Sequence, residues 1–212
     1  MKTITNLIIQ KKDKNKVNLY LDGSFFCSLA LETTLKYNLK VGNIIDEKVL
    51  ENYQLESEKN QAYEKALKLI STRYKTKKEL ENYLSQKGYM PSTIHYVIKK
   101  LGEYNFIDDE KYVESFIAHH KHKDGYLKIK QQLLQKGVKE EIIDNVLKNL
   151  DSQLEEIILL MKKYMKHKES TKDNYIKLYR YLIGKGFKSE EILKVLKEDD
   201  NDRLWYCKNR KI

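Results

Sequence analysis

The chain has 212 residues, a formal net charge of +10 and 34% charged residues. Its longest internal apolar run, residues 157–161, is far too short to span a bilayer, and the apolar stretch near the N-terminus is too short for a secretory signal. Cys27 and Cys207 form no spaced framework, so we expect a soluble, cytoplasmic protein in a reducing compartment.

Residues 1–57 have the pattern of a small β-rich module. Two extended runs in "KVNLYLDGSFFCSL" are separated by Asp22-Gly23, a dipeptide that favours a tight hairpin. The stretch "TITNLIIQ" predicts a further strand, and residues 31–38 predict a helix. An extended piece at "KVGNII" follows, and Asp46 is expected to cap a short helix that ends near Leu55.

Beyond this module, one motif returns three times at an interval of 49 residues. Gly88, Gly137 and Gly186 each follow a lysine, and a leucine stands four residues before each glycine. Apolar residues at helical spacings lie on both sides of the motif, which predicts a helix, a turn at Lys-Gly and a second helix. Glycine suits this turn because it readily adopts a positive φ at a helix C-terminus.

Each repeat also contains a third predicted helix upstream of the motif. Its sign is an apolar pair at i, i+4 spacing: Tyr63 and Leu67, Tyr112 and Phe116, Met161 and Met165. Thr76 and Glu79 have the spacing of a capping box, and Ser189 is expected to precede the last helix. The third repeat ends differently, because Asp199 stands where the others have leucine, which suits a terminal cap.

These patterns predict a mainly α protein, with three tandem three-helix repeats in an elongated array preceded by a small β-rich N-terminal module. The expected boundaries are residues 1–57 for the module and residues 58–106, 107–155 and 156–212 for the repeats. A period of this length is typical of helical arrays, in which each unit buries part of its apolar face against its neighbours.

Motifs for catalysis or metal binding are weak. The cluster of His119, His120, His122 and Asp124 has no second ligand group at a suitable spacing and stands among lysines, so we interpret it as a basic helix end. The "GKG" at residues 184–186 lacks the frame of a phosphate-binding loop. No nucleophile–base arrangement can be singled out, so the sequence predicts no enzyme, no metal site and no cofactor.

Charge alternates along the second and third repeats. Residues 119–139 carry six lysines against Asp124, residues 140–158 carry six acids against one lysine, and residues 161–180 carry seven basic side chains against two acids. A solvated surface could have this pattern, and so could a face that follows a polyanion or a charged protein lattice. Four tyrosines near predicted helix ends could pack, or could contact bases or a protein: Tyr74, Tyr104, Tyr126 and Tyr175.

Several stretches resemble the RecX regulatory family. The first repeat contributes "STRYKTKKELENYLSQKGY", and the second contributes "LGEYNFIDDEKYVESFI" followed by "GYLKIKQQLLQKGV". The third matches more loosely through "LYRYLIGKGFKSEEILKVL", and "YNLKVGNIID" is similar to the N-terminal extension of longer members from Gram-positive bacteria. The stretch between Phe116 and Gly125 departs from the family in its content of histidine and lysine.

This resemblance implies a regulator of RecA, the bacterial recombinase. Members of the family are thought to lie in the groove of the RecA–single-stranded-DNA filament and to restrain its ATPase, strand-exchange and co-protease activities, in recombinational repair and the SOS response. We expect a monomer that binds the filament and, without sequence preference, single-stranded DNA. Inhibition is the favoured direction, with activation left open.

Under this hypothesis the contacts come from basic side chains: Arg73, Lys121, Lys123, Lys128, Lys130, Lys162, Lys163 and Arg180. Lysine is a hydrated point charge, which favours phosphate attraction over reading of base edges. Asp108 and Asp109 are interpreted as caps of the first helix of the second repeat. The alternative is a stand-alone helix-turn-helix-like DNA-binding protein or repressor, against which the scarcity of arginine counts.

Overall fold

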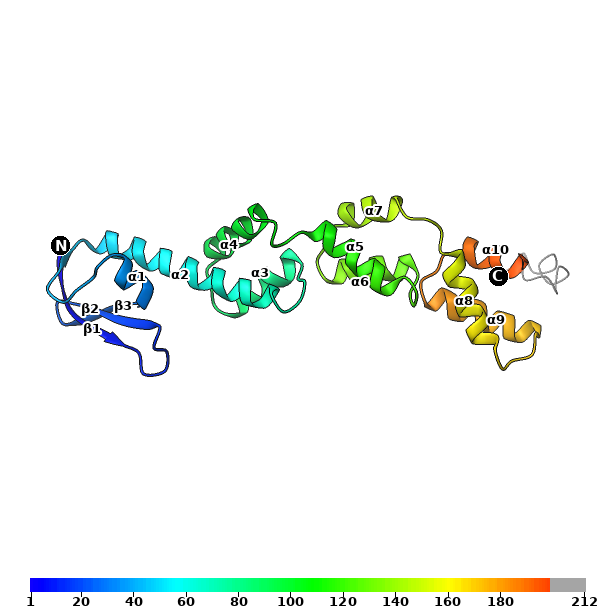
Figure 1. Cartoon of the computed structure of the whole chain (residues 1–212), viewed down its shortest axis with the longest axis horizontal. Coiled ribbons are helices and arrows are strands. Elements are labelled where there is room, and N and C mark those ends of the chain that lie inside the picture. Colours follow the sequence, from blue (N-terminus) through cyan, green and yellow to red (C-terminus); the bar gives the residue numbers. More distant parts are fainter. Residues whose placement is uncertain (199–212) are drawn as a thin grey trace. The chain divides into compact units, whose positions relative to one another are not determined.

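The computed structural model describes residues 1–198, which fall into two compact units, residues 1–107 and the part that starts at Asp108 (Figure 1). Helices predominate in both, and every strand among the described residues lies in the first unit. The prediction of a mainly α chain with three-helix repeats and an N-terminal strand module is confirmed. None of the described helices is long and apolar enough to cross a membrane.

The first unit opens with an antiparallel sheet of strand order β3-β2-β1-β4. Its strands are β1 (Lys2–Ile9), β2 (Lys16–Leu21), β3 (Ser24–Ala30) and β4 (Ile44–Ile45). Asp22 and Gly23 join β2 to β3 with φ values of 46° and 85°, the pair of positive angles that a two-residue type I′ turn requires. The predicted hairpin is therefore confirmed. Val17, Leu19 and Leu21 are buried at alternate positions of β2, as the period of two demands.

Two helices complete the module, α1 (Leu31–Lys36) and the first half of α2 (Glu47–Ile70). Asp46 caps α2 as expected, since its carboxylate accepts a hydrogen bond from the backbone N–H of Lys48 at 2.8 Å. The expected end of this helix near Leu55 is wrong. The whole helix is 24 residues long and ends at Ile70, and its sequence contains neither glycine nor proline that would end it earlier.

Helix α2 serves both the strand module and the first repeat (Figure 1). Leu50 is part of the module's core, and the Ser57 hydroxyl accepts a hydrogen bond from the Ala30 N–H at 2.7 Å. Further along, Ala62 and Ala66 are buried in the core of the first repeat. One unbroken helix therefore contributes to both cores.

The first repeat is completed by α3 (Lys77–Gln86) and α4 (Pro91–Glu103). The capping box predicted from the sequence is confirmed, since the Thr76 hydroxyl accepts from the Glu79 N–H and the Glu79 carboxylate accepts from the Thr76 N–H. Pro91 is the first residue of α4, where its lack of an N–H costs nothing.

The second unit contains six described helices. They are α5 (Asp109–His120), α6 (Tyr126–Gln135), α7 (Glu140–Lys148), α8 (Leu154–Met165), α9 (Lys172–Gly184) and α10 (Ser189–Glu198). Asp108 caps α5, because its carboxylate accepts from the N–H groups of Glu110 and Lys111 at 3.0 and 3.2 Å. Asp109 is the first helical residue and is buried, and Ser189 starts α10 rather than preceding it.

The predicted core positions of the repeats are confirmed. The buried residues on either side of the Lys-Gly turns are Leu80, Leu84, Ile94 and Val97; Ile129, Leu133, Ile143 and Val146; and Leu178, Leu182, Ile192 and Val195. Each set belongs to a separate apolar cluster, so each three-helix repeat has a core of its own. Gly88, Gly137 and Gly186 have φ values of 83°, 78° and 83°, as the turns require.

The division into residues 1–57, 58–106, 107–155 and 156–212 stays a prediction. Its first boundary falls inside α2. The proposed cap at Asp199 lies outside the described residues.

Candidate functional site

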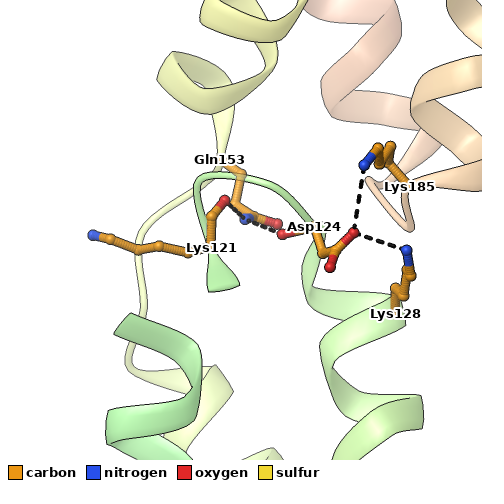
Figure 2. A network of polar contacts seen from close by, with 5 residues as sticks. All are labelled: Lys121, Asp124, Lys128, Gln153 and Lys185. Atoms are coloured by element: carbon orange, nitrogen blue, oxygen red, sulfur yellow. Dashed lines mark hydrogen bonds and ion pairs between the residues drawn. The ribbon is translucent and has the colours of Figure 1, made fainter. Parts of the chain in front are cut away.

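The basic loop after α5 is held by one buried glutamine of the α7–α8 connection. Gln153 is 1% exposed, and its side-chain Nε2 donates to the carbonyl oxygens of Lys121 and Asp124 at 3.3 Å each. Its Oε1 accepts from the N–H of Tyr126 at 2.8 Å. Figure 2 shows the two hydrogen bonds donated by Nε2, with the Lys121 side chain directed away from Asp124. One amide therefore fixes both ends of the loop.

The carboxylate of Asp124 forms ion pairs with two lysines from different repeats (Figure 2). Lys128 of α6 lies 2.8 Å from Asp124 Oδ1, and Lys185, from the turn after α9, lies 3.9 Å from it. Asp124 is itself 8% exposed, whereas the side chains of Lys128 and Lys185 are 35% and 30% exposed, so the cluster is only partly shielded from bulk water.

The two repeats also pair through their backbones at this point. The N–H of Gly125 donates to the carbonyl of Lys185 at 2.8 Å, and the N–H of Leu127 donates to the carbonyl of Gly186 at 3.1 Å. A Cβ on Gly125 would lie 2.2 Å from the carbonyl carbon of Gly186, and one on Gly186 would lie 2.4 Å from the Cβ of Lys128. Only glycine permits this approach. The Lys-Gly turn of the third repeat thus caps α6, whose own N-cap residue has no side chain.

The acidic stretch that follows α6 divides into two parts with different surroundings. Glu140 and Asp144 both pair with Lys130, at 2.7 and 2.6 Å. These two carboxylates hold the pKa of Lys130 above its usual value, through hydrogen bonds first and charge attraction second. Three of the other acids, Asp151, Glu155 and Glu156, line a groove of about 880 Å³ in the same unit.

Lysine–tyrosine contacts recur in both units. In the first repeat, Lys100 lies 4.7 Å from the ring centre of Tyr63, and Lys59 lies 4.8 Å from that of Tyr96. In the third repeat, the rings of Tyr164 and Tyr181 are 5.0 Å apart between α8 and α9, with Lys168 and Lys185 against them. The pairs of the first repeat were missed from the sequence, because the lysine and the tyrosine come from different helices. Those of the third repeat are local, with the lysine four residues after the tyrosine.

The histidine cluster is engaged in the helix that carries it. The Nδ1 atoms of His119 and His120 lie 2.7 and 2.8 Å from the carbonyl oxygens of Ser115 and Phe116, and the His120 ring stacks on Phe116. Among residues 1–198, no three histidine, cysteine or acidic side chains gather in the manner of a metal site.

Three family descriptions match the sequence in chain order. They are the regulatory protein RecX N-terminal domain over residues 2–46, the first RecX three-helix domain over residues 62–101, and the second over residues 108–147. Proteins named regulatory protein RecX are 37% identical in Clostridium perfringens strain SM101 and 39% identical in Clostridium beijerinckii, each over 80% of this chain and 82% of the relative. The chain belongs to the RecX family.

Solved structures agree with this assignment. A crystal structure of regulatory protein RecX is similar to this RecX chain with a TM-score of 0.69 and 25% identity, over 93% of this chain and 100% of the other. The crystal structure of RecX from Lactobacillus salivarius gives 0.64 and 26%, over 68% and 97%. The resemblance inferred from the repeat motifs is confirmed.

The basic residues predicted for this RecX-family chain fall into three groups. Lys128 and Lys130 have intramolecular ion-pair partners, so both contribute to the organisation of the second unit. Lys121 is half-buried and lines the acidic groove. The others are exposed and have no ion pair with another described residue: Arg73, Lys123, Lys162, Lys163 and Arg180. Arg73 lies in the first unit and the rest in the second.

The four tyrosines near helix ends also divide. Tyr74 and Tyr104 are 76% and 61% exposed, so their rings are available to a partner. Tyr126 and Tyr175 are half-buried, and Tyr175 packs against the core of the third repeat. For these two the packing interpretation is the better one.

Proposed function

We propose that this chain binds the RecA–single-stranded-DNA filament and inhibits its ATPase, strand-exchange and co-protease activities, in recombinational repair and the SOS response. The observation that carries the proposal is membership of a family of regulatory proteins, with matches to the N-terminal domain and to two three-helix domains in order. The chain would act without catalysis, as a monomer.

The repeat architecture supports this role. Each three-helix repeat has its own apolar core, so each is a separate folded surface element. A filament offers identical protomers at a regular interval. Weak contacts from successive repeats would add through effective concentration, so that tight binding needs no single strong site.

We assign the nucleic-acid contacts to the exposed basic side chains that have no ion-pair partner among residues 1–198: Arg73, Lys123, Lys162, Lys163 and Arg180. Their charges are free to replace the counterions of a phosphate backbone. Lys128 and Lys130 are assigned instead to holding the second unit together. Because most of these side chains are lysines, the attraction would be independent of base sequence.

The test is ATP hydrolysis by the cognate RecA on single-stranded DNA, titrated with this chain. Inhibition well below one copy per RecA protomer would mean action on filament growth, and inhibition only near equivalence would mean occupancy along the filament. If hydrolysis is unchanged while bare DNA is still bound, the proposal fails. A gel shift with competitor duplexes would then show whether the chain prefers a site, as a repressor would.

A further inference from the structure

The acidic groove of the second unit has a mixed lining. One stripe of α5 faces it with Glu110, Glu114, Ile117 and Lys121, at the spacings of a single helix face. The other walls come from α7, the start of α6, the α7–α8 connection and the first turn of α8. The apolar part of the lining consists of Ile117, Ala118, Tyr126, Val146, Leu150 and Leu154. Leu150 is 38% exposed, so part of this apolar surface meets solvent.

The carboxylates of the groove are largely uncompensated. Glu110, Glu114, Asp151 and Glu155 are exposed and have no ion pair with another described residue, and Glu156 has only His122 at 3.9 Å. Among the described residues that line the groove, Lys121 is the one lysine or arginine. The pKa of the Tyr126 hydroxyl is raised, first by burial and then by the charges of Glu156, Glu191 and Asp151. The negative potential therefore reaches the apolar floor.

This charge is opposite to that of the chain as a whole, which has a net charge of +10. Helix dipoles account for acids in the first turns of α5 and α8, such as Glu110 and Glu155. They do not account for Glu114, in the middle of α5, or for Asp151, in a connection between helices. A phosphate backbone would be repelled from such a surface, because both carry negative charge.

We propose that this groove docks a helical segment of the RecA protomer that presents apolar side chains flanked by lysine or arginine. The apolar floor would take the apolar side chains, and the carboxylates at the rim would pair with the cations, as in other helix-in-groove complexes. The inference rests on the proposed function and refines it. The exposed basic side chains contact DNA, whereas the acidic groove contacts protein.

The test uses the full chain with a double charge reversal, Glu114→Lys with Asp151→Lys. Neither residue lies in the first turn of a helix or has a described ion-pair partner. The matched control is Glu51→Lys with Glu64→Lys on α2, both exposed, which changes the net charge by the same amount. Binding is measured to RecA–single-stranded-DNA filaments and to the bare oligonucleotide.

We expect the groove variant to bind filaments about tenfold more weakly than the control, with bare-DNA affinity equal to that of the control. If the groove variant binds filaments as tightly as the control variant, the groove proposal is overturned while the proposed function stays intact. If the wild-type chain binds no filament, the proposed function itself fails, and the two failures are thereby distinguished.

Two further variants guard against misfolding and identify the occupant. Glu114→Gln with Asp151→Asn removes the two negative charges without adding positive ones. This variant should also weaken filament binding, and its melting temperature should equal that of the wild-type chain. A benzophenone amino acid in place of Leu150 should crosslink to RecA protein on illumination of the bound filament. A crosslink to DNA alone would contradict the proposal.

Discussion

Single residues decide how the second unit is organised. Gln153 forms hydrogen bonds with the backbones of Lys121, Asp124 and Tyr126. Nothing in the surrounding sequence marks this position as special. The residue 49 positions earlier is Tyr104, which is 61% exposed. The repeat therefore gives no sign of the glutamine's role, because that role depends on the loop opposite it.

We predict that Gln153→Ala destabilises the second unit by about 1–3 kcal/mol, since buried carbonyl groups lose their donor. Gln153→Glu should not restore stability, because a carboxylate cannot donate to the carbonyls of Lys121 and Asp124. Urea unfolding of the full chain measures both. Equal stability of wild type and the alanine variant would contradict the role assigned to this amide.

Cys27 gives a prediction about pH. Burial raises the pKa of its thiol to about 11, so the folded state favours the neutral form. The stabilising effect is complete below the ordinary thiol pKa of 9.0 and is lost as the pH rises from there through about 11. In a Cys207→Ser variant, Cys27 should react with a disulfide reagent at pH 8 only at the rate of unfolding. Rapid labelling of the folded chain would contradict this.

At the scale of elements, similar Lys-Gly turns have different neighbours. Gly88 and Gly186 have the same φ of 83°, yet a Cβ on Gly88 would meet nothing within 4 Å whereas one on Gly186 would clash with Lys128. The turn of the third repeat is thus also a docking element for α6. The repeat motif predicts the turn, but the docking depends on which neighbour the turn meets.

We predict that Gly125→Ala costs the second unit about 2 kcal/mol or more, because the added methyl would overlap the Gly186 backbone and break the backbone pairing between repeats. Gly184→Ala, at the end of α9 with open space around it, is the control and should be neutral or slightly stabilising. Calorimetry of the full chain compares the two. A Gly125→Ala variant as stable as Gly184→Ala would contradict the close backbone packing between Gly125 and Gly186.

At the scale of the whole molecule, the 41 lysine and arginine side chains include both free and ion-paired ones. Lys128 and Lys130 are paired, whereas Lys162 and Lys163 are exposed on α8 with no ion pair among the described residues. The number of basic side chains alone therefore overstates how many cations are available to a polyanion.

We predict that Lys162→Gln with Lys163→Gln weakens binding to single-stranded DNA and to filaments, and lowers the slope of log affinity against log salt by about one to two units. Lys11→Gln with Lys12→Gln removes the same charge from an exposed loop of the N-terminal module and should change the slope little. Titrations at several salt concentrations measure both. Identical slopes for the two variants would remove Lys162 and Lys163 from the interface.

The sequence by itself determined the local structure of this protein. Helical spacing of apolar residues, glycine at positive φ and the Asp22-Gly23 turn are requirements of the backbone and of near neighbours, so they can be read from the order of residues. Family membership followed from the same motifs in order. The length of α2 was misjudged because a domain boundary was expected at residue 57, whereas one unbroken helix contributes Leu50 to one core and Ala62 to another.

Tertiary structure alone decided which charges are free. The acids at residues 140–158 form one block in the sequence, yet Glu140 and Asp144 are paired with Lys130, while Asp151 joins Glu114 from α5 around an apolar groove. The physical reason is distance. Charges attract or repel according to their separation in space, and residues far apart along the chain share a groove only once the helices that carry them have packed.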